Sequence, residues 1–117
     1  MKNLIMFPPL ALVLCTACAS VPVPNEQKSA SEAAYRGARE AGAEAAPQAR
    51  LAMQLSQDEN AQGNQFVLEG KNEQAAALYD RARADAELAI GLSREAQMER
   101  SAEQAAQSVA TLRASVP

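Results

Sequence analysis

The segment Glu69-Gly70-Lys71-Asn72-Glu73 divides a long stretch of helix-forming residues into two parts. Glycine is favoured just past a helix C-terminus, and asparagine followed by an acid is typical of a helix N-cap and first turn. We therefore predict a helix over 47–69, a turn carried by Gly70 and Asn72, and a second helix over 72–112. A connection this short makes the two helices antiparallel neighbours.

A shorter helix is predicted to precede this hairpin. A capping-box motif, S-x-x-E, begins at Ser29, and the glycine at Gly42 lies shortly before Pro47, a residue that a helix tolerates best in its first turn. These signals predict a helix over 29–42. No window alternates apolar and polar residues as a half-buried strand does. The predicted fold is therefore all-α: a long antiparallel α-helical hairpin with a shorter N-terminal helix, a three-helix unit over 29–114.

Alanine is the commonest residue, 27 of 117, and there is no tryptophan or histidine. Alanine has the best helix propensity but buries little surface, so we predict thin helices that approach one another closely. Near the turn, the facing residues are predicted to be Leu51, Leu55 and Phe66 on one helix and Leu78, Tyr79 and Ala82 on the other.

The first twenty residues, MKNLIMFPPLALVLCTACAS, have the layout of an export signal. Lys2 is the only charge before Glu26, and the apolar stretch 4–14 is far shorter than the roughly 20 residues that span a membrane. Cys15 and Cys18, the only cysteines, form a C-x-x-C motif. We predict no zinc site there, because the chain offers no histidine and no third cysteine, and a redox pair lacks its βαβ context.

Ala17-Cys18 instead resembles the lipobox of bacterial lipoprotein signals, in which a small residue precedes the modified cysteine. On this interpretation 1–17 is a signal peptide cleaved between Ala17 and Cys18, and the covalent lipid (palmitate) on Cys18 is the only attached group. The proline-rich residues 18–28 form an extended, flexible tether. The residues after Cys18 include no early aspartate, which resembles signals for the periplasmic face of the outer membrane. An ordinary secretory signal, releasing a soluble protein, is the alternative.

An apolar stripe with +4, +3, +4, +3 spacing, typical of a coiled-coil seam, lies near the C-terminus. Its residues are Met98, Ala102, Ala105, Val109 and Leu112. The predicted helix over 72–112 is longer than its partner over 47–69, so this stripe lacks cover. With Ala89 added, we predict that these residues form a helix-association face for an envelope protein or a second copy of the chain.

No constellation of residues predicts catalysis. Without histidine, acid–base chemistry needs a carboxylate pair or a lysine, and the serines have no partner base. Glu95, Glu99 and Glu103 share one helix face, but calcium takes six to eight oxygen ligands, so we interpret them as a solvated face. We expect no enzyme, no metal and no small-molecule substrate. A net charge of −3 without a basic stripe argues against nucleic acid.

Three segments carry a resemblance to a known family: Ala45-Ala46-Pro47, Glu69-Gly70-Lys71-Asn72-Glu73-Gln74-Ala75 and Ala82-Arg83-Ala84-Asp85-Ala86-Glu87-Leu88-Ala89. In their order and spacing they resemble alanine-rich bacterial envelope lipoproteins of domain-of-unknown-function family 4398. The resemblance covers about residues 25–106. It implies a periplasmic helical hairpin and supplies no biochemical activity.

The sequence thus predicts a non-enzymatic outer-membrane lipoprotein that presents a periplasmic helical hairpin for protein–protein association. Its expected partners are the membrane, through the lipid, and an envelope protein or another copy. Two alternatives stay open. The protein could be a structural coiled-coil spacer lipoprotein, or a soluble secreted binding module if Cys18 is not lipidated.

Overall fold

The computed structural model describes residues 20–117, and within this range every regular element is helical. The elements are α1 (Asn25–Glu40), the 3-10 turn η1 (Ala43–Ala45), α2 (Pro47–Leu68) and α3 (Asn72–Ser115). The all-α prediction is confirmed. The predicted signal peptide over 1–17 and the lipidation site, Ala17 and Cys18, lie outside the described residues.

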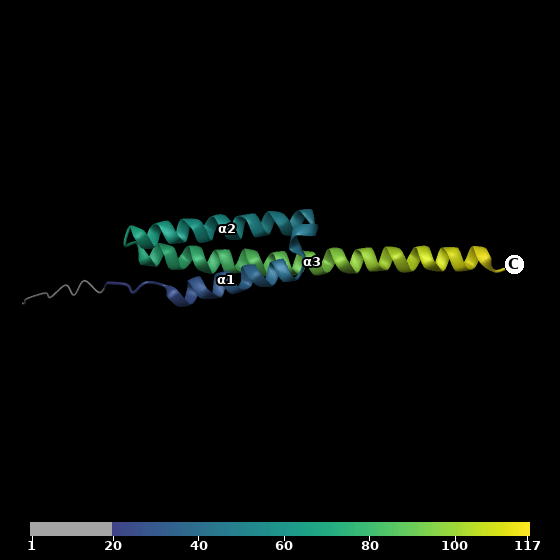
Figure 1. Ribbon diagram of the computed structural model, residues 1–117, viewed down its shortest axis with the longest axis horizontal. Helices are drawn as coiled ribbons and strands as arrows, with labels where there is room; N and C mark the ends of the chain where they lie inside the picture. The colour runs from purple at the N-terminus through teal and green to yellow at the C-terminus, as the bar shows by residue number, and fades with distance from the viewer. Residues whose placement is uncertain (1–19) are drawn as a thin grey trace, which may run out of the picture.

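Figure 1 shows α2 and α3 as an antiparallel pair, with α1 running alongside α3 in the same direction as α3. The start of α1 and the α2–α3 turn therefore lie at one end of the molecule. α3 continues well past the other end of α1 and α2. At 1.5 Å per residue, its 44 residues measure about 66 Å. The predicted hairpin with a shorter N-terminal helix is confirmed, and α1 packs on it.

The turn between α2 and α3 closes as a Schellman motif. Gly70 has φ +74°, a left-handed conformation in which a side chain would be strained. The Lys71 N–H donates to the Phe66 carbonyl at 2.8 Å, and the Gly70 N–H donates to the Val67 carbonyl at 3.0 Å. The predicted role of Gly70 is confirmed.

Asn72 lies in this turn but does not cap α3. It is the first residue inside the helix, and the N-cap position belongs to Lys71, which makes no side-chain cap. The Asn72 amide instead donates to the Val21 carbonyl at 2.7 Å. The predicted capping role is therefore wrong. The Asn72 side chain instead holds the tether against the hairpin, through a hydrogen bond to a residue 51 positions earlier in the sequence.

The first helix begins earlier than the capping-box motif predicted. The Lys28 N–H donates to the Pro24 carbonyl at 3.1 Å, so α1 starts at Asn25, and Ser29 lies inside the helix rather than at its N-cap. The predicted tether over 18–28 is accordingly helical from Asn25 onward. At its other end α1 stops at Glu40, because Gly42 adopts φ +77° and turns the chain into η1.

The core that joins the helices is made mostly of alanine. The buried apolar residues are Ala38, Ala43, Ala46, Ala49, Ala52, Met53, Ala75, Leu78, Tyr79, Ala82, Ala86 and Ala89. Leu51 and Leu55 do not face α3 as predicted; they are 59% and 47% exposed. The buried face of α2 carries smaller residues, such as Ala52 and Ser56, because small side chains let the helix axes approach. The prediction of close-packed helices is confirmed, and the choice of leucines was wrong.

One large side chain interrupts this thin core. Tyr79 of α3 is 1% exposed, and its ring lies against the backbone of Gly63 in α2. A Cβ atom at Gly63 would stand 2.7 Å from Tyr79 Cε1, closer than real side-chain contacts. The Tyr79 hydroxyl donates to Asn64 Oδ1 at 2.9 Å. Gly63 thus provides the space that the ring occupies.

Buried serines hold α1 at both ends. Ser31 Oγ lies 2.5 Å from Asn60 Oδ1 of α2. At the other end, Ser93 Oγ and Gln97 Nε2 of α3 donate to the Ala41 carbonyl at 2.6 and 2.8 Å. These bonds satisfy a carbonyl at the C-terminus of α1 that has no partner within its own helix. Within residues 20–117, Gln97 is the last residue of α3 that hydrogen-bonds to another element.

Candidate association surface

Beyond Gln97, no helix within residues 20–117 covers α3. Every residue from 97 to 117 is exposed, although the helix continues to Ser115. We call residues 98–115 the overhang. The apolar stripe lies within it, with Met98, Val109 and Leu112 exposed by 67%, 47% and 65%. Ala102 and Ala105 are exposed as well.

Ala89 does not belong to this surface. It is completely buried and packs in the cluster that joins α1, η1, α2 and α3. Its inclusion in the predicted association face is wrong, because the residue lies more than two turns before the overhang and on the inward side of α3. From here on, the stripe means Met98, Ala102, Ala105, Val109 and Leu112.

The stripe also points in a different direction from the buried face of α3. A helix turns about 100° per residue. On that basis the stripe is centred about 150° around the axis from the buried row that includes Ala75, Ala82 and Ala89. The overhang therefore does not extend the core outward. It presents its apolar side away from α1 and α2.

Where the hairpin covers the other side of α3, this side carries charged and small residues. Asp80, Glu87 and Arg94 lie within about 40° of the stripe's direction, and all three are exposed. The first large apolar side chain on this side is Met98, directly after Gln97. Large apolar side chains therefore appear on this side only where the tertiary contacts end, which is the pattern expected of a docking face.

Val116 extends this surface by one residue, and the sequence prediction missed it. It follows Leu112 by four positions, in continuation of the stripe's spacing, and is 72% exposed. The prediction stopped at 112, where the predicted helix ended. Helix α3 in fact continues to Ser115, so Val116 follows directly on the stripe.

The acids predicted as a solvated face are exposed. Glu95, Glu99 and Glu103 all point into solvent on α3. Over residues 20–117, no three side chains of the types His, Cys, Asp and Glu are close enough together to hold a metal ion.

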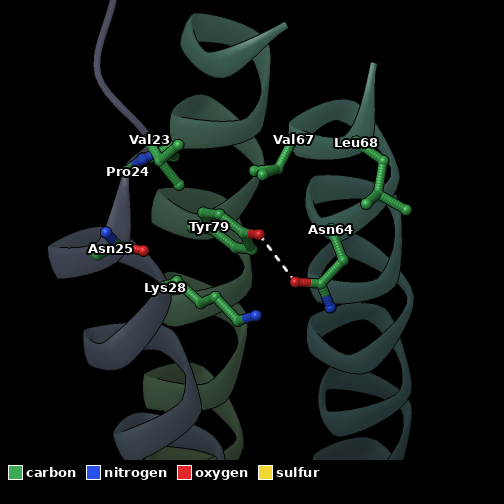
Figure 2. A pocket seen from close by; sticks show the side chains of 8 residues that line it. All are labelled: Val23, Pro24, Asn25, Lys28, Asn64, Val67, Leu68 and Tyr79. Carbon is green, nitrogen blue, oxygen red and sulfur yellow. Dashed lines mark hydrogen bonds between the residues drawn. The ribbon is translucent and has the colours of Figure 1, made fainter. Parts of the chain in front are cut away.

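A groove of about 270 Å³ lies at the tether end of the molecule, between the start of α1 and the end of α2. Figure 2 shows Val23 and Pro24 above the Tyr79 ring, with Asn64 and Val67 on the opposite wall. Burial, and then the charge of Glu32, raise the pKa of the Tyr79 hydroxyl, which keeps its proton and donates to Asn64. The groove is thus the seam where the tether packs on the hairpin.

The acid Glu59 of α2 is largely buried against α3. Its side chain is 10% exposed, and Oε1 lies 2.7 Å from Arg81 Nη2. Its second oxygen, Oε2, has no hydrogen-bond partner among residues 20–117. Burial, followed by the nearby Asp85 carboxylate, raises the pKa of Glu59 above 4.5, although Arg81 acts in the other direction.

This raised pKa predicts how stability depends on pH. The folded chain holds the Glu59 proton more tightly than the unfolded chain, so the free energy of unfolding falls as the pH rises from 4.5 through the raised pKa. Glu59→Gln keeps the shape of the protonated acid. We expect it to be more stable than the wild type at pH 8 and nearly equal at pH 4, as measured by urea unfolding.

Arg81→Gln is the matched control for this prediction. It removes the cation beside the buried carboxylate, so it should lower the free energy of unfolding at pH 8. A Glu59→Gln protein that is less stable than the wild type at pH 8 would show that the ion pair outweighs the burial of the charge.

None of the helices within residues 20–117 has the length and apolar character needed to cross a bilayer. No family model matches this chain, and no curated protein or solved structure is detectably similar to it. The resemblance to family 4398 therefore rests on the three quoted segments alone and stays a prediction.

Proposed function

We propose that the protein is a non-enzymatic outer-membrane lipoprotein that presents its helical hairpin in the periplasm for association with protein. The observation that carries this proposal is the overhang, a fully exposed helix with an apolar stripe directed away from the hairpin. In water an exposed apolar row of this kind gains free energy when another surface covers it. Helix-to-helix docking is the recognition mode that fits a single row with this spacing.

The hairpin suits this role because it makes the overhang rigid. Starting an isolated helix in water is unfavourable, because its first turn fixes several residues for a single hydrogen bond. Here the overhang is the continuation of α3, whose first part is fixed by the α2 and α1 contacts. A partner therefore meets a helix that is already formed and loses less conformational entropy on binding.

The two ends of the molecule also suit an anchored protein. The tether residues 20–24 and the α2–α3 turn lie at one end, whereas the overhang lies at the other (Figure 1). The rise of α3 places Met98 about 40 Å from Asn72. A lipid on Cys18 would hold the tether end at the membrane, and the stripe would lie at the other end of the molecule, free of the lipid attachment.

A photo-crosslinking amino acid at Ala105 of the full chain tests the association surface in a Gram-negative host. We expect a crosslinked adduct that Leu112→Asp abolishes, because it places a carboxylate within the stripe. Gln107→Asp introduces the same charge on the opposite side of the overhang and should leave the adduct intact. An adduct that survives Leu112→Asp would contradict the proposed surface.

The same cells, labelled with palmitate, test the anchor. We expect label on the wild type and on Cys15→Ser, none on Cys18→Ser, and the labelled protein in the outer-membrane fraction. Label on Cys18→Ser, or on no form, would overturn the anchor. A soluble secreted module would then be the function, provided that the Leu112-dependent adduct persists.

A further inference from the structure

We propose that the stripe is covered by the stripe of a second copy of this chain, with the two overhangs antiparallel and overlapping from Met98 to Val116. The proposal rests on the proposed function, since it names the partner of the same surface. Three features of the overhang favour this pairing: the order of large and small residues, the charges beside the stripe, and its length.

The order of side-chain sizes is complementary to itself only in the antiparallel direction. In the proposed register Ala102 faces Leu112 of the second copy, and Ala105 faces its Val109. Each layer then combines one small and one large side chain, which permits one even spacing between the helices. Parallel pairing would place alanine on alanine in the middle and leucine on leucine at one end, and no single spacing suits both.

The charges beside the stripe agree with this register. Glu99 and Arg113 occupy the same flank of the stripe, 14 positions apart. In the antiparallel pair Glu99 of each copy lies across from Arg113 of the other, so the symmetric pair gains two favourable contacts. A shift by one heptad would place Leu112 against the exposed Glu95 instead. That penalty selects the register.

The length and direction of the overhang leave room for a second copy. The overlap of 19 residues measures about 28 Å and begins at Met98, directly after the last tie of α3 to α1 at Gln97. The stripe points about 150° away from the face that α1 and α2 cover. The second helix therefore lies on the free side of α3, and neither hairpin obstructs the other.

Disulfide crosslinking tests both the partner and its direction. Both partners of every contact described above lie within residues 20–117, and this range contains no cysteine. Single-cysteine substitutions are therefore made in a protein of residues 20–117. In the antiparallel pair, two copies of residue 102, or two copies of residue 112, lie about 15 Å apart along the axis. Ala102→Cys and Leu112→Cys should therefore form no disulfide separately and should form one when mixed under mild oxidation.

Each other outcome overturns the proposal. Disulfides within Leu112→Cys alone would show a parallel pair, and no disulfide in the mixture, with both proteins folded by circular dichroism, would show that the chain does not pair with itself. Sedimentation gives a second readout without cysteine. We expect Leu112→Asp to weaken the dimer at least about 100-fold and Gln107→Asp to leave it unchanged.

Failure of this proposal is distinguishable from failure of the proposed function. If the mixture forms no disulfide while cells still give a Leu112-dependent adduct with another protein, association through the stripe stands and self-pairing is wrong. If no adduct in cells depends on Leu112, both proposals fail.

Discussion

Tyr79→Ala is expected to lower the free energy of unfolding by about 3–5 kcal/mol, the usual cost of removing a buried aromatic side chain. Tyr79 is the largest fully buried side chain in residues 20–117, and alanines form most of the core around it. Small neighbours with little freedom to move do not refill the cavity. A domain of this size is stable by only about 5–15 kcal/mol, so the loss is a large fraction of the total. Urea unfolding followed by circular dichroism measures it.

Tyr79→Phe separates the ring from its hydroxyl. It keeps the packing against Gly63 and removes only the hydrogen bond to Asn64, so the expected loss is about 1 kcal/mol. A Tyr79→Phe protein as unstable as Tyr79→Ala would contradict the view that the ring, rather than the hydroxyl, joins α2 to α3.

Gly63→Ala is expected to lower the free energy of unfolding by about 1–3 kcal/mol, although alanine is the better helix former by about 1 kcal/mol. The new Cβ would stand 2.7 Å from Tyr79 Cε1 and 3.0 Å from its Cδ1. The buried ring cannot rotate away alone, so α2 and α3 must separate along their contact. Thermal or urea unfolding checks the sign of the change.

Gly91→Ala is the matched control, because Gly91 also lies inside a helix and has open space around it. It should raise the free energy of unfolding by about 1 kcal/mol. Gly63→Ala made in the Tyr79→Ala protein should likewise cost nothing, because the ring that it meets is gone. Equal effects of Gly63→Ala with and without the ring would contradict the steric explanation.

The sequence predicted the elements of the fold well where local chemistry determines them. Gly70 ends α2 by a Schellman turn that needs only a positive φ, and Pro47 begins α2 in the first-turn position. The predicted start of α1 was wrong. The capping-box motif placed it at Ser29, but the Pro24 carbonyl accepts the first hydrogen bond of the helix.

The contact face between the helices was harder to predict. Hydropathy ranks leucine above alanine, and so it selected Leu51 and Leu55, but helices that approach closely bury the row of smallest residues instead. The stripe followed from its spacing. Spacing alone does not reveal which side of a helix its neighbours cover, and for that reason Ala89 was assigned to the wrong face.

The alanine core affects how clearly the ancestry of such a chain can be recognised from its sequence. A residue larger than alanine at Ala38, Ala82 or Ala86 pushes two helices apart, and glycine there weakens the helix. Selection for close packing therefore keeps alanine at these positions. Alanine is also common on exposed helix faces, where no packing requires it. The exposed positions are free to change. Two descendants of one ancestor would therefore come to resemble each other more in the distances between their helices than in their amino-acid sequences.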